Sequence, residues 1–327
     1  MSSRSCTTER GARSARVRAL AKLNLGLRVL HQRADGYHEL RTVFQTISLA
    51  DELEIEFTPS RRTSVALSSN LDIPDNIAVR AARLTMDAMR ATGAVRMRLK
   101  KRIPPGGGLG GGSSDAAAVL LALPALAARR LELEERLKLA ADLGSDVPFF
   151  LLGGTAVGLG RGTELYPLPD LPPRHVLVVT PNRHVSTAEA YRKLRRKLTN
   201  GLSFQYISSF QSGVWRLDAK LLAADAAGSC DNDFEGVVFG LHPQLRSIQR
   251  KLASLGANPA RLTGSGASLF GVFATRAEAR RAAGALAGER VFAVSLVGRR
   301  HYRRLWWSQL AEHVEQTEWP PQSRYAR

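Results

Sequence analysis

Six glycines lie within residues 106–112, and this segment constrains the fold and chemistry of the chain most strongly. The whole segment is Pro104, Pro105, Gly106, Gly107, Gly108, Leu109, Gly110, Gly111, Gly112, Ser113 and Ser114. Because glycine has no Cβ atom, these backbone amides can approach a ligand closely. The apolar stretch that follows predicts a buried helix over 114–130, with a kink at Pro124. A helix start presents unpaired N–H groups, so the segment predicts a polyphosphate site, with the two serine hydroxyls available to phosphate or a metal ion.

Three other interpretations of the glycine segment are less consistent with the sequence. Gly106, Gly108 and Gly111 satisfy the dinucleotide-binding spacing, but the acidic residues about 20 positions later lie in a helical pattern rather than at a strand end. A Walker loop needs a Gly-Lys dipeptide, and the sequence has none. A flexible linker would not lead directly from a strand into a buried helix. Phosphate binding is therefore the favoured interpretation.

The ordered chain is predicted to begin with a strand at Val17. Every odd position from Val17 to Val29 is apolar, which is the period of a strand with one buried face. Lys22 and Asn24 would then lie side by side on the opposite face. Further strands are predicted over 42–49, 52–57, 95–103, 157–165, 176–180 and 291–297. Helices are predicted over 74–92 with Asp75 as N-cap, 133–143, 186–198 with a capping box at Ser186, 241–255 and 276–287, and a surface loop over 200–213.

These elements predict an α+β fold with two domains. The proline-rich stretch 167–174 separates them, and the expected ranges are 17–170 and 171–300. The order strand, helix, helix, strand in the second range is typical of an α+β sandwich. Residues 1–16 are expected to form a disordered basic extension, a transit peptide or the product of a misplaced start codon. Residues 301–327 are expected to form a basic tail that contains tryptophans.

Composition excludes several classes of protein. The longest apolar stretch, from Ala116 to Ala128, is too short for a membrane span of about 20 residues. Two cysteines, Cys6 and Cys230, provide neither a disulfide framework nor a metal cluster, which favours a reducing, cytoplasmic setting. The net charge of +18 invites a nucleic-acid interpretation, but the charge is spread along the chain and only 6% of the residues are aromatic. An acidic small molecule such as a phosphate ester fits the charge equally well.

The glycine segment resembles the phosphate-binding motif of the galactokinase, homoserine kinase, mevalonate kinase and phosphomevalonate kinase superfamily. Its triple-glycine form around Leu109 is most similar to the branch that phosphorylates 4-diphosphocytidyl-2-C-methyl-D-erythritol. Further motifs of that branch follow in order at 21–25, 33–40, 143–148, 232–235 and 262–267, so the resemblance spans about residues 17–298. It implies a two-domain kinase with an N-terminal domain like ribosomal protein S5 and a ferredoxin-like C-terminal domain. The implied activity is ATP-dependent phosphorylation of the substrate's 2-hydroxyl in the non-mevalonate isoprenoid pathway, with Mg²⁺ accompanying ATP.

The resemblance also implies catalytic roles for two residues. Asp146 would accept the proton of the substrate hydroxyl, and the alternative is that it caps the helix that follows. Lys22 would orient Asp146 and stabilise developing charge, and without the resemblance it is an ordinary solvated strand residue. Asp115, beside the phosphate loop, would either point away or help to hold Mg²⁺. No cluster of protein side chains is expected to bind the metal directly.

The remaining implied site residues contact the two ligands. Tyr37 follows the Asp35-Gly36 turn, so its ring could stack on cytosine while His38 hydrogen-bonds the base edge. Tyr191 would be a second stacking wall, or simply a core aromatic, and Asn24 and Thr187 complete the substrate set. Asn76 would lie near adenine, or serve only at a helix start. The 263–267 turn would close over phosphates, or be only a tight turn.

Two other functions stay open at this point. The same fold could act on homoserine, mevalonate or a sugar, although Tyr37 and His38 disfavour that. A nucleic-acid-binding protein would bind heparin in a salt-dependent manner and turn over no ATP. The expected partners are ATP and a cytidine-diphosphate-linked small molecule, with no nucleic acid and no membrane, and the protein is expected to be a monomer or homodimer.

Overall fold

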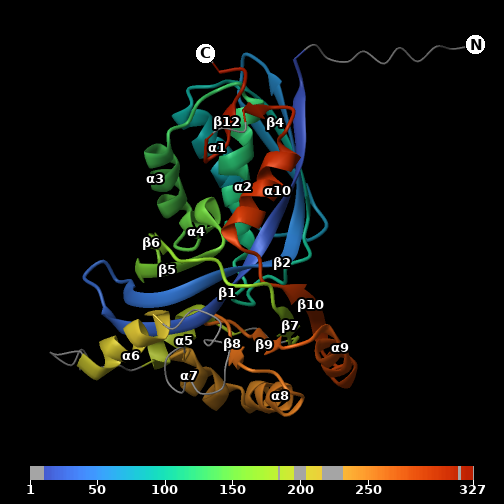
Figure 1. Cartoon of the computed structure of the whole chain (residues 1–327). Coiled ribbons are helices and arrows are strands. Elements are labelled where there is room, and N and C mark those ends of the chain that lie inside the picture. Colours follow the sequence, from blue (N-terminus) through green and yellow to red (C-terminus); the bar gives the residue numbers. More distant parts are fainter. Residues whose placement is uncertain (1–10, 183–184, 195–203, 216–230, 316–317, 327) are drawn as a thin grey trace, which may run out of the picture.

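A computed structural model describes residues 11–182, 185–194, 204–215, 231–315 and 318–326. Within these residues the chain forms a six-stranded sheet, a four-stranded sheet and a small two-stranded pair. Figure 1 shows the two larger sheets at opposite ends of the molecule, joined by the long strands β1 and β2. The predicted division at 170/171 falls between the strands β6 and β7.

The first sheet has the order β3-β4-β2-β5-β6, and β1 also pairs with β2. Its strands are β1 (Arg13–Gln32), β2 (His38–Pro59), β3 (Ser64–Ser69), β4 (Gly93–Lys100), β5 (Thr155–Gly160) and β6 (Glu164–Pro167). Only β3 and β4 run parallel, and the other pairs are antiparallel. Four helices pack on this domain: α1 (Ile77–Ala88), α2 (Gly111–Leu126), α3 (Leu133–Leu143) and α4 (Val147–Leu152). Residues 114–126 of α2 are all buried, as expected of a helix that is apolar all round.

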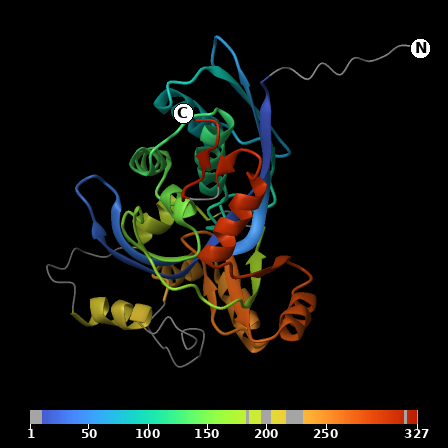
Figure 2. The same cartoon turned by 45° about the horizontal axis from the view of Figure 1, so that its top comes forward.

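The second sheet has the order β10-β7-β9-β8. Its strands are β7 (His175–Thr180), β8 (Ala260–Leu262), β9 (Leu269–Phe273) and β10 (Arg290–Ser295). The helices of this half are α5 (Thr187–Lys193), α6 (Phe204–Trp215), α7 (Phe234–Leu241), α8 (Pro243–Ser254) and α9 (Arg276–Ala285). The chain then returns to the first domain through α10 (Arg299–Gln309), β11 (Val314–Glu315) and β12 (Gln322–Ser323), as Figure 2 shows in red.

The predicted one-faced first strand is buried on both faces between residues 19 and 27. Leu20 packs in the core of the first domain, whereas Leu23 and Leu25 pack with residues of the second sheet. The odd-numbered face, which was predicted to be buried, therefore packs on the second domain at Leu23 and Leu25. The even-numbered face, which was expected to be solvated, is covered by the first domain at Leu20. The strand also begins at Arg13, before the expected Val17, because residues 13–16 pair with the end of β2. The expected extension is shortened accordingly, and residues 1–10 lie outside the described residues.

Several other elements differ from their predicted form. The strands predicted over 42–49 and 52–57 are one strand, since Asp51 between them is buried with polar partners. The strand predicted over 157–165 is a hairpin that turns at Gly162, whose φ is +93°. Asn76 rather than Asp75 caps α1, and its Oδ1 accepts a hydrogen bond from Ala78 N at 3.0 Å. Short β3 was not predicted, because half of its residues are serines and most of them are exposed.

The second half also contains corrections. The helix predicted over 241–255 is α8, which begins at Pro243, a residue without an N–H that suits the first turn of a helix. Helix α7, which precedes it, was not predicted. Helix α6 replaces most of the loop predicted over 200–213, whose first residues lie outside the described chain. Helix α5 ends at Lys193, and the residues up to the predicted end at 198 are not described. The tail predicted over 301–327 is a folded element, in which Tyr302 and Trp306 are buried in the core of the first domain.

Candidate active site

The glycine segment leads directly into the N-terminus of α2. Gly110 is the N-cap residue in the left-handed conformation, and the helix already begins at Gly111 inside the segment. No side chain caps this N-terminus, so its first amides are free for a ligand. Leu109 O accepts a hydrogen bond from Lys22 N at 3.0 Å, which attaches the loop to β1. The geometry is that of an anion site at a helix N-terminus.

A second glycine turn, at 263–267, packs directly on this loop. A Cβ atom on Gly108, whose φ is +76°, would lie 2.2 Å from Thr263 O, so only glycine fits there. A Cβ atom on Gly266 would lie 2.4 Å from Gly108 N. Thr263 Oγ1 accepts a hydrogen bond from Asn24 N at 3.0 Å. The turn therefore joins the loop and β1 to the second domain.

Lys22 and Asp146 form an ion pair at the mouth of the loop. Lys22 Nζ lies 3.2 Å from Asp146 Oδ2 and donates a hydrogen bond to Asn24 Oδ1 at 2.5 Å. The Lys22 side chain is 4% exposed, whereas that of Asp146 is 32% exposed. Asp146 stands at the N-cap position of α4 but makes no capping hydrogen bond. Its carboxylate is directed to Lys22 and is open to solvent, so the alternative role as a helix cap is not what the structure shows.

Thr42 continues this polar chain and was missed by sequence reasoning. Asn24 Nδ2 donates to Thr42 Oγ1 at 2.8 Å, and the Thr42 hydroxyl donates to Gly26 O at 2.8 Å. The two hydrogen bonds determine which way the Asn24 amide faces, so its oxygen points to Lys22. A buried threonine on a strand carries no sequence signal of this role.

The structure brings together only two of the three residues predicted to bind the cytosine base. The rings of His38 and Tyr191 lie 4.6 Å apart between centroids, although they are far apart in the sequence. Tyr37 is instead 51% exposed, and the Arg161 guanidinium lies 4.5 Å from its ring centroid. Arg161, in the hairpin turn after β5, was not anticipated from sequence.

A cavity of about 440 Å³ adjoins the His38–Tyr191 pair. Its lining comes from the end of β1, from His38 and from the α5 region. The residues are Val29, Leu30, His31, Gln32, His38, Ala188, Tyr191, Arg192 and Leu194, and Tyr37 is not one of them. Burial lowers the pKa of His38, which favours the neutral ring. Burial raises the pKa of Tyr191, and the negative charge of Asp146 adds to the rise.

Thr187 lies at the first position of α5. Ser186 caps that helix by accepting a hydrogen bond from Glu189 N at 3.3 Å, as the capping-box spacing predicted. Ser265 Oγ donates to Thr187 Oγ1 at 3.0 Å. The start of α5 is therefore attached to the second glycine turn and faces the same region as the loop.

The two serines of the loop differ in the freedom of their hydroxyls. Ser114 is buried and donates to Leu20 O at 2.7 Å, so its hydroxyl holds α2 against β1. Ser113 is half-buried. Ser113 is consequently the hydroxyl of the pair that is available to a ligand.

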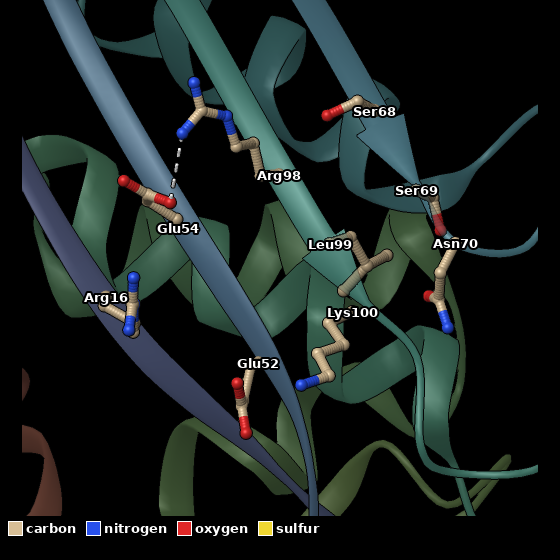
Figure 3. Close-up of a pocket in the computed structure, with 9 residues that line it drawn as sticks. All are labelled: Arg16, Glu52, Glu54, Ser68, Ser69, Asn70, Arg98, Leu99 and Lys100. Carbon is tan, nitrogen blue, oxygen red and sulfur yellow. Dashed lines mark ion pairs between the residues drawn. The ribbon is translucent and has the colours of Figure 1, made fainter.

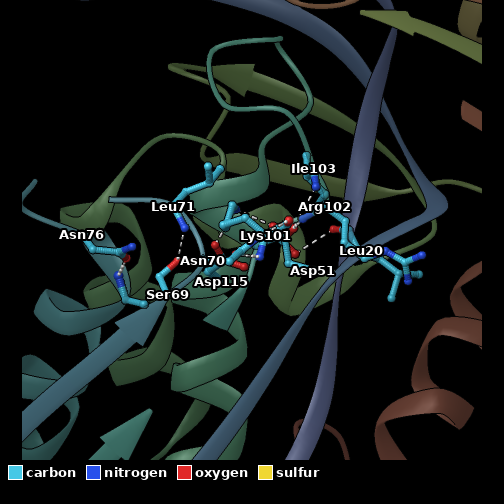
Figure 4. Close-up of polar contacts among 12 residues, drawn as sticks. Leu20, Asp51, Ser69, Asn70, Leu71, Asn76, Lys101, Arg102, Ile103 and Asp115 are labelled. Carbon is cyan, nitrogen blue, oxygen red and sulfur yellow. Dashed lines mark hydrogen bonds and ion pairs between the residues drawn. The ribbon is translucent and has the colours of Figure 1, made fainter. Parts of the chain in front are cut away.

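Asp115 points away from the loop into a buried ionic cluster with Lys101 and Asp51 (Figure 4). Lys101 Nζ donates to Asp115 Oδ2 at 2.7 Å and also to Asp51 Oδ2. Asp51 Oδ1 accepts from the backbone amides of Arg102 and Ile103 at 2.5 and 2.8 Å. Burial raises the pKa of Asp115 to about 7, opposed by Lys101 and aided by the charge of Asp51. The cluster therefore connects the residue after β4, Lys101, to Asp115 of α2 and stabilises the two elements on either side of the glycine loop.

Another hollow of about 440 Å³ lies on the first sheet (Figure 3). It is lined by side chains of both charges, among them Arg98 and Glu54, whose charged groups lie 3.7 Å apart. No residue predicted from the sequence for the site lies there. Its mixed charge favours neither an anion nor a cation.

The described residues offer neither a metal cluster nor a membrane span. They contain no group of three or more His, Cys, Asp or Glu side chains placed to hold a metal ion. No helix among them is long and apolar enough to cross a membrane.

Comparisons with known proteins show the family to which the chain belongs. Models of the GHMP kinases N terminal domain and the GHMP kinases C terminal region match residues 76–154 and 210–290. A 4-diphosphocytidyl-2-C-methyl-D-erythritol kinase of Solibacter usitatus is 55% identical over 317 residues, which covers 96% of this chain and 98% of the relative. The chain belongs to the 4-diphosphocytidyl-2-C-methyl-D-erythritol kinase family.

Other members of the family and of the fold are more distant. A family member from Geobacillus sp. strain WCH70 is 36% identical over 87% of this chain and 98% of its own length. A crystal structure of a 4-(cytidine 5'-diphospho)-2C-methyl-D-erythritol kinase matches with a TM-score of 0.72 and 39% identity, covering 86% of this chain and 99% of the other. A homoserine kinase structure from Cytophaga hutchinsonii has a TM-score of 0.65 at 19% identity, over 88% of this chain and 95% of that chain, and shows the fold alone. The predicted family, two-domain kinase fold and kinase activity are confirmed.

Proposed function

We propose that this chain transfers the γ-phosphoryl group of ATP to the 2-hydroxyl of 4-diphosphocytidyl-2-C-methyl-D-erythritol, with Asp146 as the proton acceptor. The observation that carries the proposal is the Lys22–Asp146 ion pair, 3.2 Å long, at the mouth of the glycine loop. A carboxylate that is one-third exposed can receive a hydroxyl, while its buried lysine partner holds it in place. Phosphoryl transfer needs this combination of positioning and charge.

The glycine loop is proposed to bind the phosphates of ATP. The uncapped N-terminus of α2 and the absence of Cβ atoms from 106–108 and 110–112 support this role. The second glycine turn packs on the same loop and could close over the outer phosphates. Asn76 caps α1, so its predicted contact with adenine would be made by atoms other than the capping oxygen.

Lys22 is proposed to neutralise charge on the transferred phosphoryl group while it orients Asp146. Its ammonium group is buried, and it donates to Asn24, whose own orientation is set by Thr42. A fixed positive charge in a site shielded from water stabilises developing negative charge strongly. The hydrogen-bonded chain from Thr42 to Lys22 supplies that fixed position.

Mg²⁺ is proposed to be carried by the ATP phosphates rather than by a preformed protein site. Asp115 is paired with Lys101, and the Ser114 hydroxyl is committed to Leu20. Ser113 is the remaining loop hydroxyl that could reach the ion. Mg²⁺ commonly keeps several waters and binds mainly through substrate phosphates, which suits so sparse a donor set. The ion would neutralise phosphate charge.

The cytidine end of the substrate is proposed to bind at His38 and Tyr191. Their close rings and the adjoining cavity support a binding site for an aromatic base. Asn24 and Thr187 both hydrogen-bond to the second glycine turn, which packs on the loop, and they are proposed to contact the methylerythritol and diphosphate. Tyr37 could contribute only from the exposed rim, with Arg161 over its ring.

The test of the catalytic assignment is Asp146→Asn. Loss of a general base lowers turnover by about 10²–10⁴-fold, and ATP binding should be kept. Asp142→Asn, a carboxylate near the end of α3, is the matched control and should turn over normally. Near-normal turnover of a folded Asp146→Asn variant would overturn the assignment.

A panel of hydroxyl acceptors tests the choice of substrate. The cytidine-linked substrate should be phosphorylated far faster than 2-C-methyl-D-erythritol 4-phosphate, homoserine, mevalonate or a sugar. Equal use of the acceptor without cytidine would contradict the pyrimidine site. Salt-dependent heparin binding without ATP turnover would instead favour the nucleic-acid alternative. Absence of nucleic-acid and membrane partners, a monomeric or homodimeric state and a cytoplasmic location stay predictions.

A further inference from the structure

The C-terminal segment from α10 onward contacts the helix that carries Asp146. Helix α4 has six residues and begins directly after Asp146. So short a helix has too few internal hydrogen bonds to be stable alone, so its position depends on the elements packed around it. At its far end the C-terminal carbonyl groups have no partners within the helix and need external donors.

Two side chains of the C-terminal segment supply these donors. The Tyr302 hydroxyl donates to Phe150 O, and Trp319 Nε1 donates to Leu151 O at 2.9 Å. Tyr302 is fully buried, and its ring lies 6.3 Å from that of Trp319 between centroids. Two consecutive carbonyls at the end of α4 are thus held by residues that lie 152 and 168 positions later in the chain.

The turn after α4 packs so closely on the C-terminal segment that only glycine fits at two of its positions. Gly153 has a φ of +68°, and a Cβ atom on it would lie 2.2 Å from the Tyr302 ring. A Cβ atom on Gly154 would lie 2.6 Å from Arg299 Cβ. Arg299 also donates to Leu168 O at 3.1 Å and to Thr155 O. The start of α10 is held in turn by Asp170, which accepts hydrogen bonds from its first amides.

The segment lies outside the part of the chain that the family models match. The C-terminal model ends at residue 290, and α10 begins at Arg299. The Geobacillus relative is matched over 98% of its own length but only 87% of this chain, so the chain has residues that this relative lacks. The contacts of Tyr302 and Trp319 with α4 are therefore not accounted for by the two matched domains. Figures 1 and 2 show α10, in red, packed against the first domain.

We infer that Tyr302 and Trp319 are positioning residues for phosphoryl transfer: they hold α4 so that Asp146 stays in register with Lys22. This inference rests on the proposed role of Asp146 as proton acceptor. Lys22 is positioned independently, from β1, by Asn24 and the loop. The distance between the two side chains therefore depends on where α4 is held, and small displacements of reacting groups cost large factors in rate.

The test measures the single-turnover rate of phosphoryl transfer in Tyr302→Phe and Trp319→Phe, at saturating ATP and substrate. Each change removes one donor and keeps an aromatic ring. Each should lower the rate about three- to tenfold, the range expected from the net value of one hydrogen bond, and leave ATP affinity unchanged. The double variant should lose more than either single one.

Two matched controls lie in the same segment. Tyr325→Phe removes a hydroxyl that donates to Glu312 O at 2.8 Å, away from α4. Trp307→Phe makes the same change in the indole that packs on Trp319, and among the described residues Trp307 has no hydrogen bond to α4. Both controls should keep the wild-type single-turnover rate, whatever their effect on thermal stability.

The same variants made in an Asp146→Asn background separate this inference from the proposed function. If α4 acts through Asp146, Tyr302→Phe and Trp319→Phe should cause no further loss of rate there. A normal rate in Asp146→Asn itself would overturn the proposed function. A large effect of Asp146→Asn, with wild-type rates in the Tyr302 and Trp319 variants, would overturn only the positioning role. Equal losses in both backgrounds would also overturn it, since the segment would then act independently of the carboxylate.

Discussion

Lys22 and Lys101 are both nearly completely buried, and both pair with aspartate. Their side chains are 4% and 3% exposed. The partner of Lys22 is Asp146, which is 32% exposed, whereas the partners of Lys101 are Asp51 and Asp115, at 0% and 2%. A carboxylate open to solvent can meet an incoming hydroxyl, and one enclosed on all sides can only brace the fold. Solvent access of the aspartate, rather than burial of the lysine, therefore distinguishes the proposed catalytic pair from the buried ionic cluster.

The largest expected effect is on stability, from Lys101→Met. Removal of the ammonium leaves two buried carboxylates without their charge partner, and such a loss costs about 3–5 kcal/mol of unfolding free energy. Urea unfolding measures it, with Thr85→Val, a buried polar side chain of α1 that donates to Ala81 O in its own helix, as a milder control. An unchanged unfolding free energy would contradict the stabilising role of the Lys101 cluster.

Lys22→Met should show the opposite pattern. Turnover should fall about 10²–10³-fold, as on removal of a preorganised charge-stabilising donor. Stability should change little, because Asp146 stays solvated. Steady-state kinetics and urea unfolding of the same sample test both, with the exposed Lys138→Met as control. If Lys22→Met unfolds the protein as Lys101→Met is expected to, the distinction between the lysines fails.

Tyr37→Ala tests whether an exposed aromatic side chain, like the exposed Asp146 carboxylate, contacts the substrate. Because Tyr37 could reach the base only from the exposed rim, its loss should cost the lower end of the about 1–3 kcal/mol of full base stacking, or roughly fivefold in affinity for the cytidine-linked substrate, with ATP binding unchanged. Calorimetry measures both affinities. Tyr166 is exposed to almost the same extent, 52% against 51%, so Tyr166→Ala is a matched control. Equal affinity of the two variants would leave base recognition to His38 and Tyr191 alone.

The last expected effect is the pH dependence contributed by Asp115, which is spread over several pH units at no more than about 1.4 kcal/mol for each unit. Its pKa of about 7 in the folded chain lies above its ordinary value of 3.8, so between those values the folded state holds a proton that the unfolded state has released. This group's contribution to stability therefore falls as pH rises from about 4 to about 7. Unfolding free energies across that range should show wild type losing stability relative to Asp115→Asn. A constant difference between the two would show that Asp115 is already ionised at the lower pH.

The two lysines also show how far local sequence patterns reach. The glycine loop, the Lys22-to-Asn24 alternation and the Asp146 motif each depend on residues close together in the chain, so the sequence alone predicts them. Lys101 carries no comparable signal, because its partners lie 50 and 14 residues away. The 301–327 region was expected to be a tail, since its spacing of tryptophans and arginines does not say which surface will receive it.

Local sequence determined the phosphate loop and the strand that carries Lys22, because glycine conformations, helix starts and strand alternation are short-range properties. The family and the two-domain kinase fold followed from the resemblance of several motifs in the same order. Only the tertiary structure decided that β1 is buried on both faces, that Thr42 sets the orientation of Asn24 beside Lys22, and that the ring of His38 lies next to that of Tyr191 rather than that of Tyr37. It also decided that α10 and Trp319 close the end of α4. Each of these depends on packing between segments distant in the chain, where the gain from burying apolar surface and satisfying polar groups outweighs what any one segment prefers alone.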